Sequence, residues 1–425
     1  MYTKRTRHSI QAVLYLLPIM LLAACGGGGS GGGGAGCATP TGLPYFFGAD
    51  DGSGVGAELW ASNGQACGTA MVADINPTGG GWPNNWGEPF LEHNGLVYFN
   101  AIDGLNGYEM WQSDGTQAGT TLVANIGETT THGDPFGFTA MGDLIFFSAV
   151  NTAAGREPWT HDTVGGTTTL LKDVRAGVDP SNPNTFLAMN GTMYFNAYTA
   201  TEGYEIYSSD GTAGGTAILA DINAGGAHFT TSNKALLGNK FFFGGTDANG
   251  KELWESDGNV GGTLRLVDIV SGAFSSNPNQ FTTVGNLIFF TADSVGDGSN
   301  YELWATNGTA AGTYQVADIN TGGASNITDL VAFNGQAYFF ATDGGAEGQQ
   351  LWKSDGTPTG TVRVTDKPFT ADPFELVASQ GKLFFGATTA EAGQELWVSN
   401  GTNAGTRMVM DINPGSANGY TGGSF

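Results

Sequence analysis

The chain has 425 residues, of which 39 are Asp or Glu and 15 are Lys or Arg, giving a formal net charge of −24 at pH 7. A surface this acidic repels nucleic acids and anionic lipid headgroups, so neither is an expected direct partner. Glycine contributes 70 residues, but aromatic residues make up 11% of the chain, which is more than disordered linkers contain. The composition therefore favours many tight turns between apolar strands.

Residues 1–24 have the pattern of an export signal, in which basic residues precede an apolar run too short for a comfortable membrane span. The run ends in Leu-Ala-Ala-Cys at Cys25 and resembles the lipobox of bacterial lipoproteins, which are cut before a cysteine that is then lipidated. We expect Cys25 to anchor the chain to a membrane. Gly26, in place of an aspartate, favours the outer membrane, on its periplasmic or surface side. A plain secretory signal is the alternative.

Residues 25–36 follow as a Gly-rich tether, with an r.m.s. reach of about 20 Å, and residues 37–425 are predicted to form one domain. Cys37 and Cys67 remain after lipidation of Cys25. In an oxidising compartment this pair indicates a disulfide, and two free thiols are the alternative.

A phrase such as "YELWATNGTAAGTYQVADIN" recurs through the domain with a period of about 48 residues, a spacing within the range of propeller blades. Its third-strand aromatic residue is expected to pack between blades rather than to bind a ligand. The eight positions are Trp60, Trp111, Trp159, Tyr207, Trp254, Trp304, Trp352 and Trp397.

Each repeat predicts four short antiparallel strands, which in the sixth copy are 280–284, 287–292, 301–306 and 314–319. Dipeptides such as Asn190-Gly191 and Asn334-Gly335 separate the first two strands, and two-residue hairpins favour them because both positions need positive φ. The chain is therefore predicted to be an all-β, closed eight-bladed β-propeller. Residues 41–50 resemble a second strand and the C-terminal segment resembles the approach to a first strand, so both ends are expected to share one blade. An open solenoid is the alternative.

The repeated Glu-Leu-Trp, Gly-Thr and Asp-Ile-Asn units resemble the bacterial ELWxxDGT repeat family, which includes proteins labelled hyalin-like. The resemblance covers Leu43 to Asn413 and implies a secreted or surface-displayed repeat protein, without a settled activity. Pro158, Tyr207 and Gln350 depart from the repeat pattern. The turn "SDGT" also resembles the Asp-box of sialidase-type propellers, in which the aspartate holds the hairpin and is not catalytic. We expect that structural role for Asp114, Asp210, Asp257 and Asp355.

The loops between second and third strands are acidic, and the glutamate that begins each third strand is expected near the same rim. Carboxylates on Gly-rich loops are typical calcium ligands. A calcium site is predicted on these loops, and the alternative is that the acids only cap turns or lie solvated at the surface; no other cofactor is expected. The candidate ligands are Asp50, Asp51, Asp103, Asp247, Asp293, Asp297 and Asp343.

No catalytic residue is assigned, because the histidines are scattered and no nucleophile, zinc or phosphate-loop motif occurs. The sequence is interpreted as a monomeric, lipid-anchored binding or scaffold module for a protein or glycan partner, and not as an enzyme. Two alternatives remain: an extracytoplasmic propeller enzyme, hydrolase or dehydrogenase-like, with its site at the channel mouth, and a purely structural envelope protein.

Overall fold

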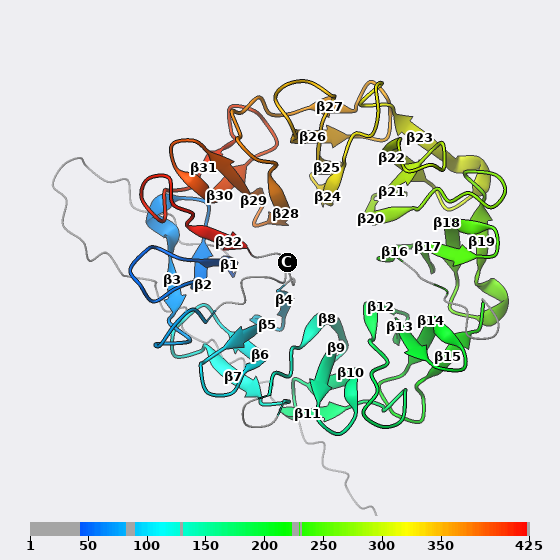
Figure 1. Cartoon of the computed structure of the whole chain (residues 1–425), viewed down its shortest axis with the longest axis horizontal. Helices are drawn as coiled ribbons and strands as arrows, with labels where there is room; N and C mark the ends of the chain where they lie inside the picture. The colour runs from blue at the N-terminus through cyan, green and yellow to red at the C-terminus, as the bar shows by residue number, and fades with distance from the viewer. Residues whose placement is uncertain (1–42, 82–89, 128–130, 223–228, 230–231, 423–425) are drawn as a thin grey trace, which may run out of the picture. The chain divides into compact units, whose positions relative to one another are not determined.

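The computed structural model describes residues 43–81, 90–127, 131–222, 229 and 232–422. Within these residues the chain folds into eight four-stranded antiparallel sheets arranged around an axis, which confirms the β-propeller (Figure 1). Three short 3-10 turns accompany the strands: η1 (Ala66–Gly68), η2 (Val260–Gly262) and η3 (Ala310–Gly312). In the described part of the chain no helix is long and apolar enough to span a membrane.

The first four blades, in ring order, follow the predicted repeats. Blade 1 combines β1 (Tyr45–Ala49), β2 (Glu58–Ser62) and β3 (Thr69–Ala73) with β32 (Tyr420–Gly422). Blade 2 contains β4 (Leu91–His93), β5 (Leu96–Ile102), β6 (Tyr108–Ser113) and β7 (Thr121–Ala124). Blade 3 contains β8 (Phe136–Met141), β9 (Leu144–Asn151), β10 (Gly155–Asp162) and β11 (Thr167–Leu170). Blade 4 contains β12 (Asn184–Met189), β13 (Thr192–Thr199), β14 (Gly203–Ser209) and β15 (Ala217–Ala220).

The other four blades repeat this order. Blade 5 contains β16 (Ala235–Leu237), β17 (Lys240–Asp247), β18 (Gly250–Ser256) and β19 (Leu264–Val267). Blade 6 contains β20 (Asn279–Val284), β21 (Leu287–Asp293), β22 (Tyr301–Thr306) and β23 (Thr313–Ala317). Blade 7 contains β24 (Thr328–Phe333), β25 (Gln336–Ala341), β26 (Gln350–Ser354) and β27 (Val362–Arg363). Blade 8 contains β28 (Phe374–Ser379), β29 (Lys382–Thr389), β30 (Gly393–Ser399) and β31 (Arg407–Met408).

Two-residue hairpin turns join the first strand of a blade to its second strand. Asn190 and Gly191 have φ of 52° and 75°, and Asn334 and Gly335 have φ of 49° and 74°. Positive φ at both turn residues matches the twist of the two strands that the turn joins. Asn and Gly tolerate this conformation, so the dipeptides identified in the sequence start the blades.

The ring is closed by the two ends of the chain, as the sequence predicts. β32 pairs with β1 through Gly422–Gly48 and Tyr420–Ala49. The buried hydroxyls of Tyr45 and Tyr420 lie 3.0 Å apart. This pairing excludes the open solenoid, because the first blade takes its innermost strand from the C-terminal segment.

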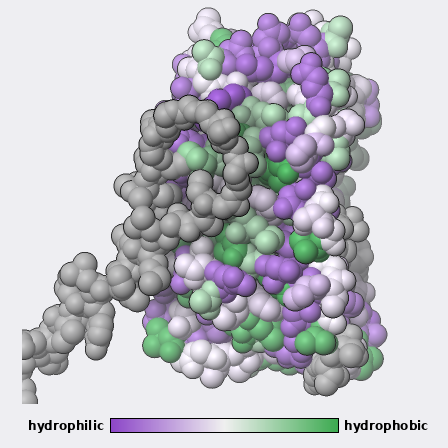
Figure 2. Space-filling view, turned by 90° about the vertical axis from the view of Figure 1, so that its left-hand side faces the viewer, coloured by the Kyte–Doolittle hydropathy of each residue, from purple (hydrophilic) through white to green (hydrophobic). Residues whose placement is uncertain are grey.

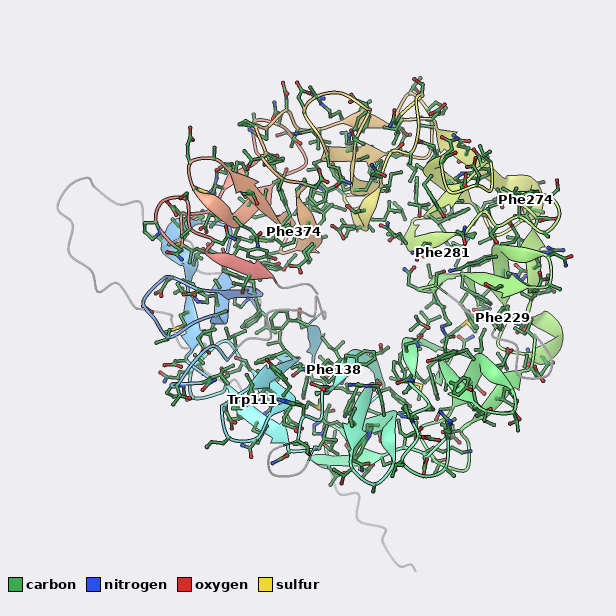
Figure 3. All side chains as sticks on the ribbon, in the orientation of Figure 1. Trp111, Phe138, Phe229, Phe274, Phe281 and Phe374 are labelled. Carbon is green, nitrogen blue, oxygen red and sulfur yellow. The ribbon has the colours of Figure 1, made fainter. Side chains whose placement is uncertain are left out.

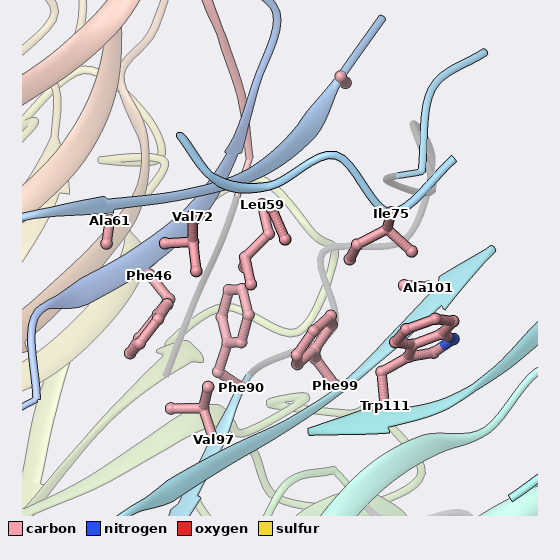
Figure 4. Packing of buried hydrophobic residues seen from close by; sticks show 12 residues of the cluster. Phe46, Leu59, Ala61, Val72, Ile75, Phe90, Val97, Phe99, Ala101 and Trp111 are labelled. Carbon is pink, nitrogen blue, oxygen red and sulfur yellow. The ribbon is translucent and has the colours of Figure 1, made fainter. Parts of the chain in front are cut away.

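Buried side chains fill the space between neighbouring blades instead of forming one central core. Between blades 1 and 2, Phe46 and Leu59 belong to the same buried cluster as Phe90, Phe99 and Trp111 (Figure 4). Second strands are buried on both faces, as in the Leu287–Asp293 pattern, because each is sandwiched between adjacent sheets. The repeated aromatic residues on the third strands all belong to, or pack against, these inter-blade clusters.

The outer side of blade 1 and its neighbours mixes hydrophilic residues with separate hydrophobic ones (Figure 2). The first strand of each blade lies nearest the axis, and the last strand lies at the periphery (Figure 1). The side chains drawn on these strands leave an opening at the centre of the ring, which we call the central channel (Figure 3).

Candidate functional site

The aspartates of the repeated turn lie at the surface and accept hydrogen bonds within their own turns. The backbone N–H of Thr116 donates to Asp114 Oδ1 at 2.9 Å, and that of Thr357 donates to Asp355 Oδ1 at the same distance. Asp210 and Asp257 accept equivalent bonds. These four side chains hold the turn between third and fourth strands.

The glutamates that begin the third strands are fully buried, which corrects the expectation that they contribute to an acidic rim. The Glu252 carboxylate accepts the backbone N–H groups of Ile269 and Ser276, both at 2.8 Å. These donors belong to the connection that leads to the next blade. The other buried members of the set are Glu58, Glu109, Glu157, Glu205, Glu302 and Glu395. Burial raises the pKa of Glu58 and of Glu395 to about 7.

The seven candidate calcium ligands are divided among the second-to-third-strand connections of blades 1, 2, 5, 6 and 7, and each accepts a hydrogen bond from a nearby backbone N–H. Asp103, for example, accepts the backbone N–H groups of Leu105 and Asn106, both at 2.8 Å. The same holds for Asp50, Asp51, Asp247, Asp293, Asp297 and Asp343. In the described ranges no group of three or more His, Cys, Asp or Glu side chains is placed to hold a metal ion. Calcium binding stays a prediction.

Two of the three cysteines, Cys25 and Cys37, lie outside the described residues. Cys67 lies at the exposed η1 turn that follows β2, the third strand of blade 1 counted from the axis. Lipidation and the Cys37–Cys67 disulfide therefore stay predictions, as do the domain boundaries at residues 24, 36 and 37.

The innermost strands carry a feature that the sequence analysis missed. Five residues before the hairpin turn in blades 4, 6, 7 and 8, a non-glycine residue takes a positive φ: 52° at Thr185, 57° at Gln280, 55° at Asp329 and 56° at Glu375. The pairing with the second strand shifts register at this point, as expected of a β-bulge. We call this set, together with the equivalent Asn233, the inner belt. Phe281 and Phe374, each next to a belt residue, lie on the channel side of the ring (Figure 3).

Belt side chains reach across to the backbone of the following blade. Asn233 donates to the carbonyl of Phe281 at 3.1 Å and accepts its N–H at 3.2 Å. Gln280 Nε2 donates to the carbonyl of Ile327 at 2.7 Å. The Asp329 carboxylate accepts backbone N–H groups of blade 8, including that of Glu375. These bonds fix the orientation of the Asn233, Gln280 and Asp329 side chains.

Asp329 and Glu375 form a carboxyl pair on adjacent blades. Burial, followed by the nearby negative charge of Glu375, raises the pKa of Asp329 to about 6. The hydroxyl of Tyr420 donates to Glu375 Oε2 at 3.0 Å. Non-glycine residues with positive φ are uncommon, and such strain concentrates at functional sites. Here two strained carboxyl residues lie together on the wall of the channel.

An open pocket of about 420 Å³ adjoins this pair and spans the innermost strands of blades 5, 6 and 7. Its lining consists of Asn233, Asn279, Gln280, Thr282, Thr328, Asp329 and Leu330. Three belt residues belong to the lining. The inner belt therefore joins the carboxyl pair to a polar pocket, and we take this region as the candidate functional site.

The inner belt corresponds to a position of the repeat at which the residue type varies between copies, and a search for shared residues overlooks such a position. At the position five residues before each turn, the chemistry changes from copy to copy through Gly137, Thr185, Asn233, Gln280, Asp329 and Glu375. The flanking positions are mostly apolar or hydroxyl-bearing. A repeat that builds only a frame has no need for such variation, so comparing the copies at each position would have identified the belt.

Comparison with known proteins supports the fold. The chain matches no family model and no curated protein. A solved structure titled as an analysis of two prolyl endopeptidases aligns with a TM-score of 0.52 at 10% identity, covering 75% of this chain and 48% of that chain. A puromycin hydrolase structure aligns with a TM-score of 0.50 at 13% identity, covering 82% and 55% respectively. The chain thus spans about half the length of these structures.

These comparisons overturn two predictions. The chain was interpreted as a non-enzymatic binding or scaffold module, whereas the solved structures that share its fold are those of peptidases and a hydrolase. The sequence analysis had assigned no catalytic residue because the histidines are scattered and no nucleophile, zinc or phosphate-loop motif occurs.

Proposed function

We propose that the chain is a hydrolase of peptide or related acyl bonds, whose carboxyl pair Asp329 and Glu375 acts on substrates that enter the central channel. The observation that carries this proposal is the placement of two carboxyl groups in different environments on one wall of the channel. A carboxyl group with a raised pKa beside a second carboxyl group, as Asp329 is beside Glu375, is typical of acid–base sites. The class of bond is taken from the peptidases and the hydrolase that share the fold.

The chemistry divides between the two groups. The Glu375 carboxylate accepts a proton from a water molecule as that water attacks the carbonyl carbon of the substrate. Protonated Asp329 donates its proton to the leaving nitrogen or oxygen as the bond to the carbonyl carbon breaks. A pKa of about 6 keeps a share of Asp329 protonated near neutral pH, as a general acid requires.

The surroundings orient Glu375 for this role. The Tyr420 hydroxyl donates a hydrogen bond to Glu375 Oε2, and the same hydroxyl lies 3.0 Å from that of the buried Tyr45. This chain of hydroxyls limits rotation of the carboxylate. Because Tyr420 lies on β32, the strand that closes the ring also positions the proposed base.

The proposal includes an extracytoplasmic location. Cleavage before Cys25 and lipidation of that residue would tether the propeller to the outer membrane, with residues 26–36 as the spacer. Radiolabelled palmitate incorporation into the wild-type chain, but not into C25S, tests the anchor independently of activity.

The hydrolase proposal is tested with the full chain, solubilised in detergent, against a fluorogenic peptide and ester library. Wild type is expected to release product, while D329N and E375Q are each expected to lose about a hundredfold in rate or more. E391Q, which changes an exposed loop acid, is the matched control and should retain full activity. Equal rates for wild type, D329N and E375Q, or no turnover of any member of the library, would contradict the proposal.

A further inference from the structure

The pocket beside the carboxyl pair contains two hydrogen-bond acceptors without a partner. Gln280 Oε1 and Thr328 Oγ1 are both buried and both lack a hydrogen bond among the described residues. Buried polar atoms are normally paired, and an unpaired one requires an explanation. Both residues line the same pocket.

The orientation of Gln280 determines which atom it offers. Its Nε2 is committed to the carbonyl of Ile327 at 2.7 Å, so Oε1 is the atom that remains. Asn233, on the other side of the pocket, has both its amide nitrogen and its amide oxygen engaged by Phe281. Asn279, at the exposed edge of the pocket, accepts a hydrogen bond through Oδ1 from the backbone N–H of Gln280. The buried side-chain amide atom of this pocket that lacks a partner is therefore an acceptor, Gln280 Oε1, which suits a ligand that brings donors.

Charge favours a cationic donor. None of the residues that line the pocket is Lys, Arg or His, and Asp329 is one of them. Glu375 carries a second carboxyl group beside Asp329, and the chain as a whole has a formal net charge of −24. A negative channel raises the local concentration of cations and steers them inward. An ammonium group has three donors and no acceptor, so it complements these atoms.

We propose that this pocket is a substrate subsite for a primary ammonium group, held by Gln280 Oε1 and Thr328 Oγ1 beside the catalytic carboxyl pair. This inference rests on the proposed function and specifies its substrate class, namely peptides with a free α-amino group or a lysine side chain. Both sources present the same chemistry, and the experiment below separates them.

Binding is measured calorimetrically at pH 7 with three amidated tripeptides: H-Ala-Ala-Ala-NH₂, Ac-Ala-Ala-Ala-NH₂ and Ac-Ala-Lys-Ala-NH₂. The full chain carries E375Q, so that turnover does not disturb the titration. At least one amine-bearing peptide is expected to bind about tenfold more tightly than the fully acetylated peptide, since hydrogen bonds to charged groups are among the stronger ones. Preference for the first peptide identifies the α-amino group, and preference for the third identifies the lysine side chain.

The variants Q280M and T328V remove one acceptor each at similar side-chain volume. Each is expected to reduce the preference for the amine-bearing peptide about five- to tenfold and to leave affinity for the acetylated peptide unchanged. Q315M, on the peripheral strand β23, is the matched control. Thermal melting verifies that each variant is folded. Because Q280M and T328V are tested separately, a folding defect in one of them leaves the other as a test.

The outcomes separate this inference from the hydrolase proposal. Equal affinity for all three peptides, or a preference that survives both Q280M and T328V, overturns the ammonium subsite even if the wild type hydrolyses peptides. A preference that both variants abolish supports the subsite even if no hydrolysis is detected, in which case the proposed function fails alone.

Discussion

Replacing Glu252 with Ala tests whether the buried glutamates of the repeat hold the blades together. The Glu252 carboxylate accepts the N–H groups of Ile269 and Ser276 at 2.8 Å and the Ser276 hydroxyl at 2.6 Å. In E252A these three donors lose their acceptor. Each hydrogen bond to a charged group contributes about 1.5–3 kcal/mol to stability. Relief of the cost of burying the carboxylate offsets part of this loss, so we expect a net destabilisation of about 3–5 kcal/mol.

The assay is urea unfolding at pH 7, followed by tryptophan fluorescence, with the midpoint and slope compared between wild type and E252A. E391A, which removes an exposed loop glutamate, is the control and should change the free energy of unfolding by less than about 0.5 kcal/mol. A loss below about 1 kcal/mol in E252A would refute the reasoning, because it would mean that the inter-blade connection is held without the carboxylate.

Blade 7 provides a natural comparison, because Gln350 takes the place of the glutamate. Its Oε1 accepts the N–H of Lys367 at 3.0 Å, while its Nε2 donates to the carbonyl of the same residue at 3.0 Å. The segment that follows blade 7 therefore directs a carbonyl oxygen at the Gln350 side chain, whereas the groups that contact the Glu252 carboxylate are all donors. We therefore expect Q350E to destabilise the fold at neutral pH, since it places a carboxylate against a carbonyl oxygen.

Four further outcomes are expected. Burial raises the pKa of Glu58 and Glu395 to about 7, so the folded state binds more protons than the unfolded state between pH 5 and 7. The melting temperature measured by calorimetry should therefore fall as the pH rises through this range. A rise in melting temperature would contradict the raised pKa of these two glutamates. With Asp329 as the general acid and a pKa of about 6, hydrolysis should decline above pH 6, and a rate that grows from pH 6 to 8 would exclude that role. Replacing Tyr420 with Phe should lower the hydrolytic rate and leave the circular dichroism spectrum unchanged; full activity would remove Tyr420 from the site. In G119A the new methyl group would meet the Asp114 carboxylate at 2.0 Å, so urea unfolding should show a loss of about 1–3 kcal/mol, and wild-type stability would show that the turn can adjust.

The fold was predictable from the sequence because its signals are local and repeated. Hairpin dipeptides such as Asn190-Gly191 mark the start of each blade, and the aromatic residue of each third strand marks its centre. Closure was also predictable, since residues 41–50 resemble a second strand and the C-terminal segment resembles the approach to a first strand, and β1 and β32 do pair.

The candidate site was not predictable in the same way. The sequence shows that Glu252 begins a strand, but its acceptor role depends on the N–H of Ile269, 17 residues later, which reaches it only when the connection folds back. Likewise, Asp329 and Glu375 lie 46 residues apart and become neighbours only because successive innermost strands stand side by side around the axis. Comparing the repeats identifies the residues that all copies share, whereas Asp329 and Glu375 occupy a position at which the copies differ.

The shared blade has a consequence for the order in which the molecule can form. Tyr45 and Tyr420 lie 375 positions apart, so their contact is among the last that a growing or translocating chain can make. Blades 2 to 8 can each assemble from contiguous sequence, with short loops to close, whereas blade 1 must wait for the final segment. Until then β1 presents an unpaired edge, which is the kind of surface that recruits a strand from another molecule. A chain stalled or cut before Tyr420 would therefore be prone to exchange strands with its neighbours, because β32 would not cover β1.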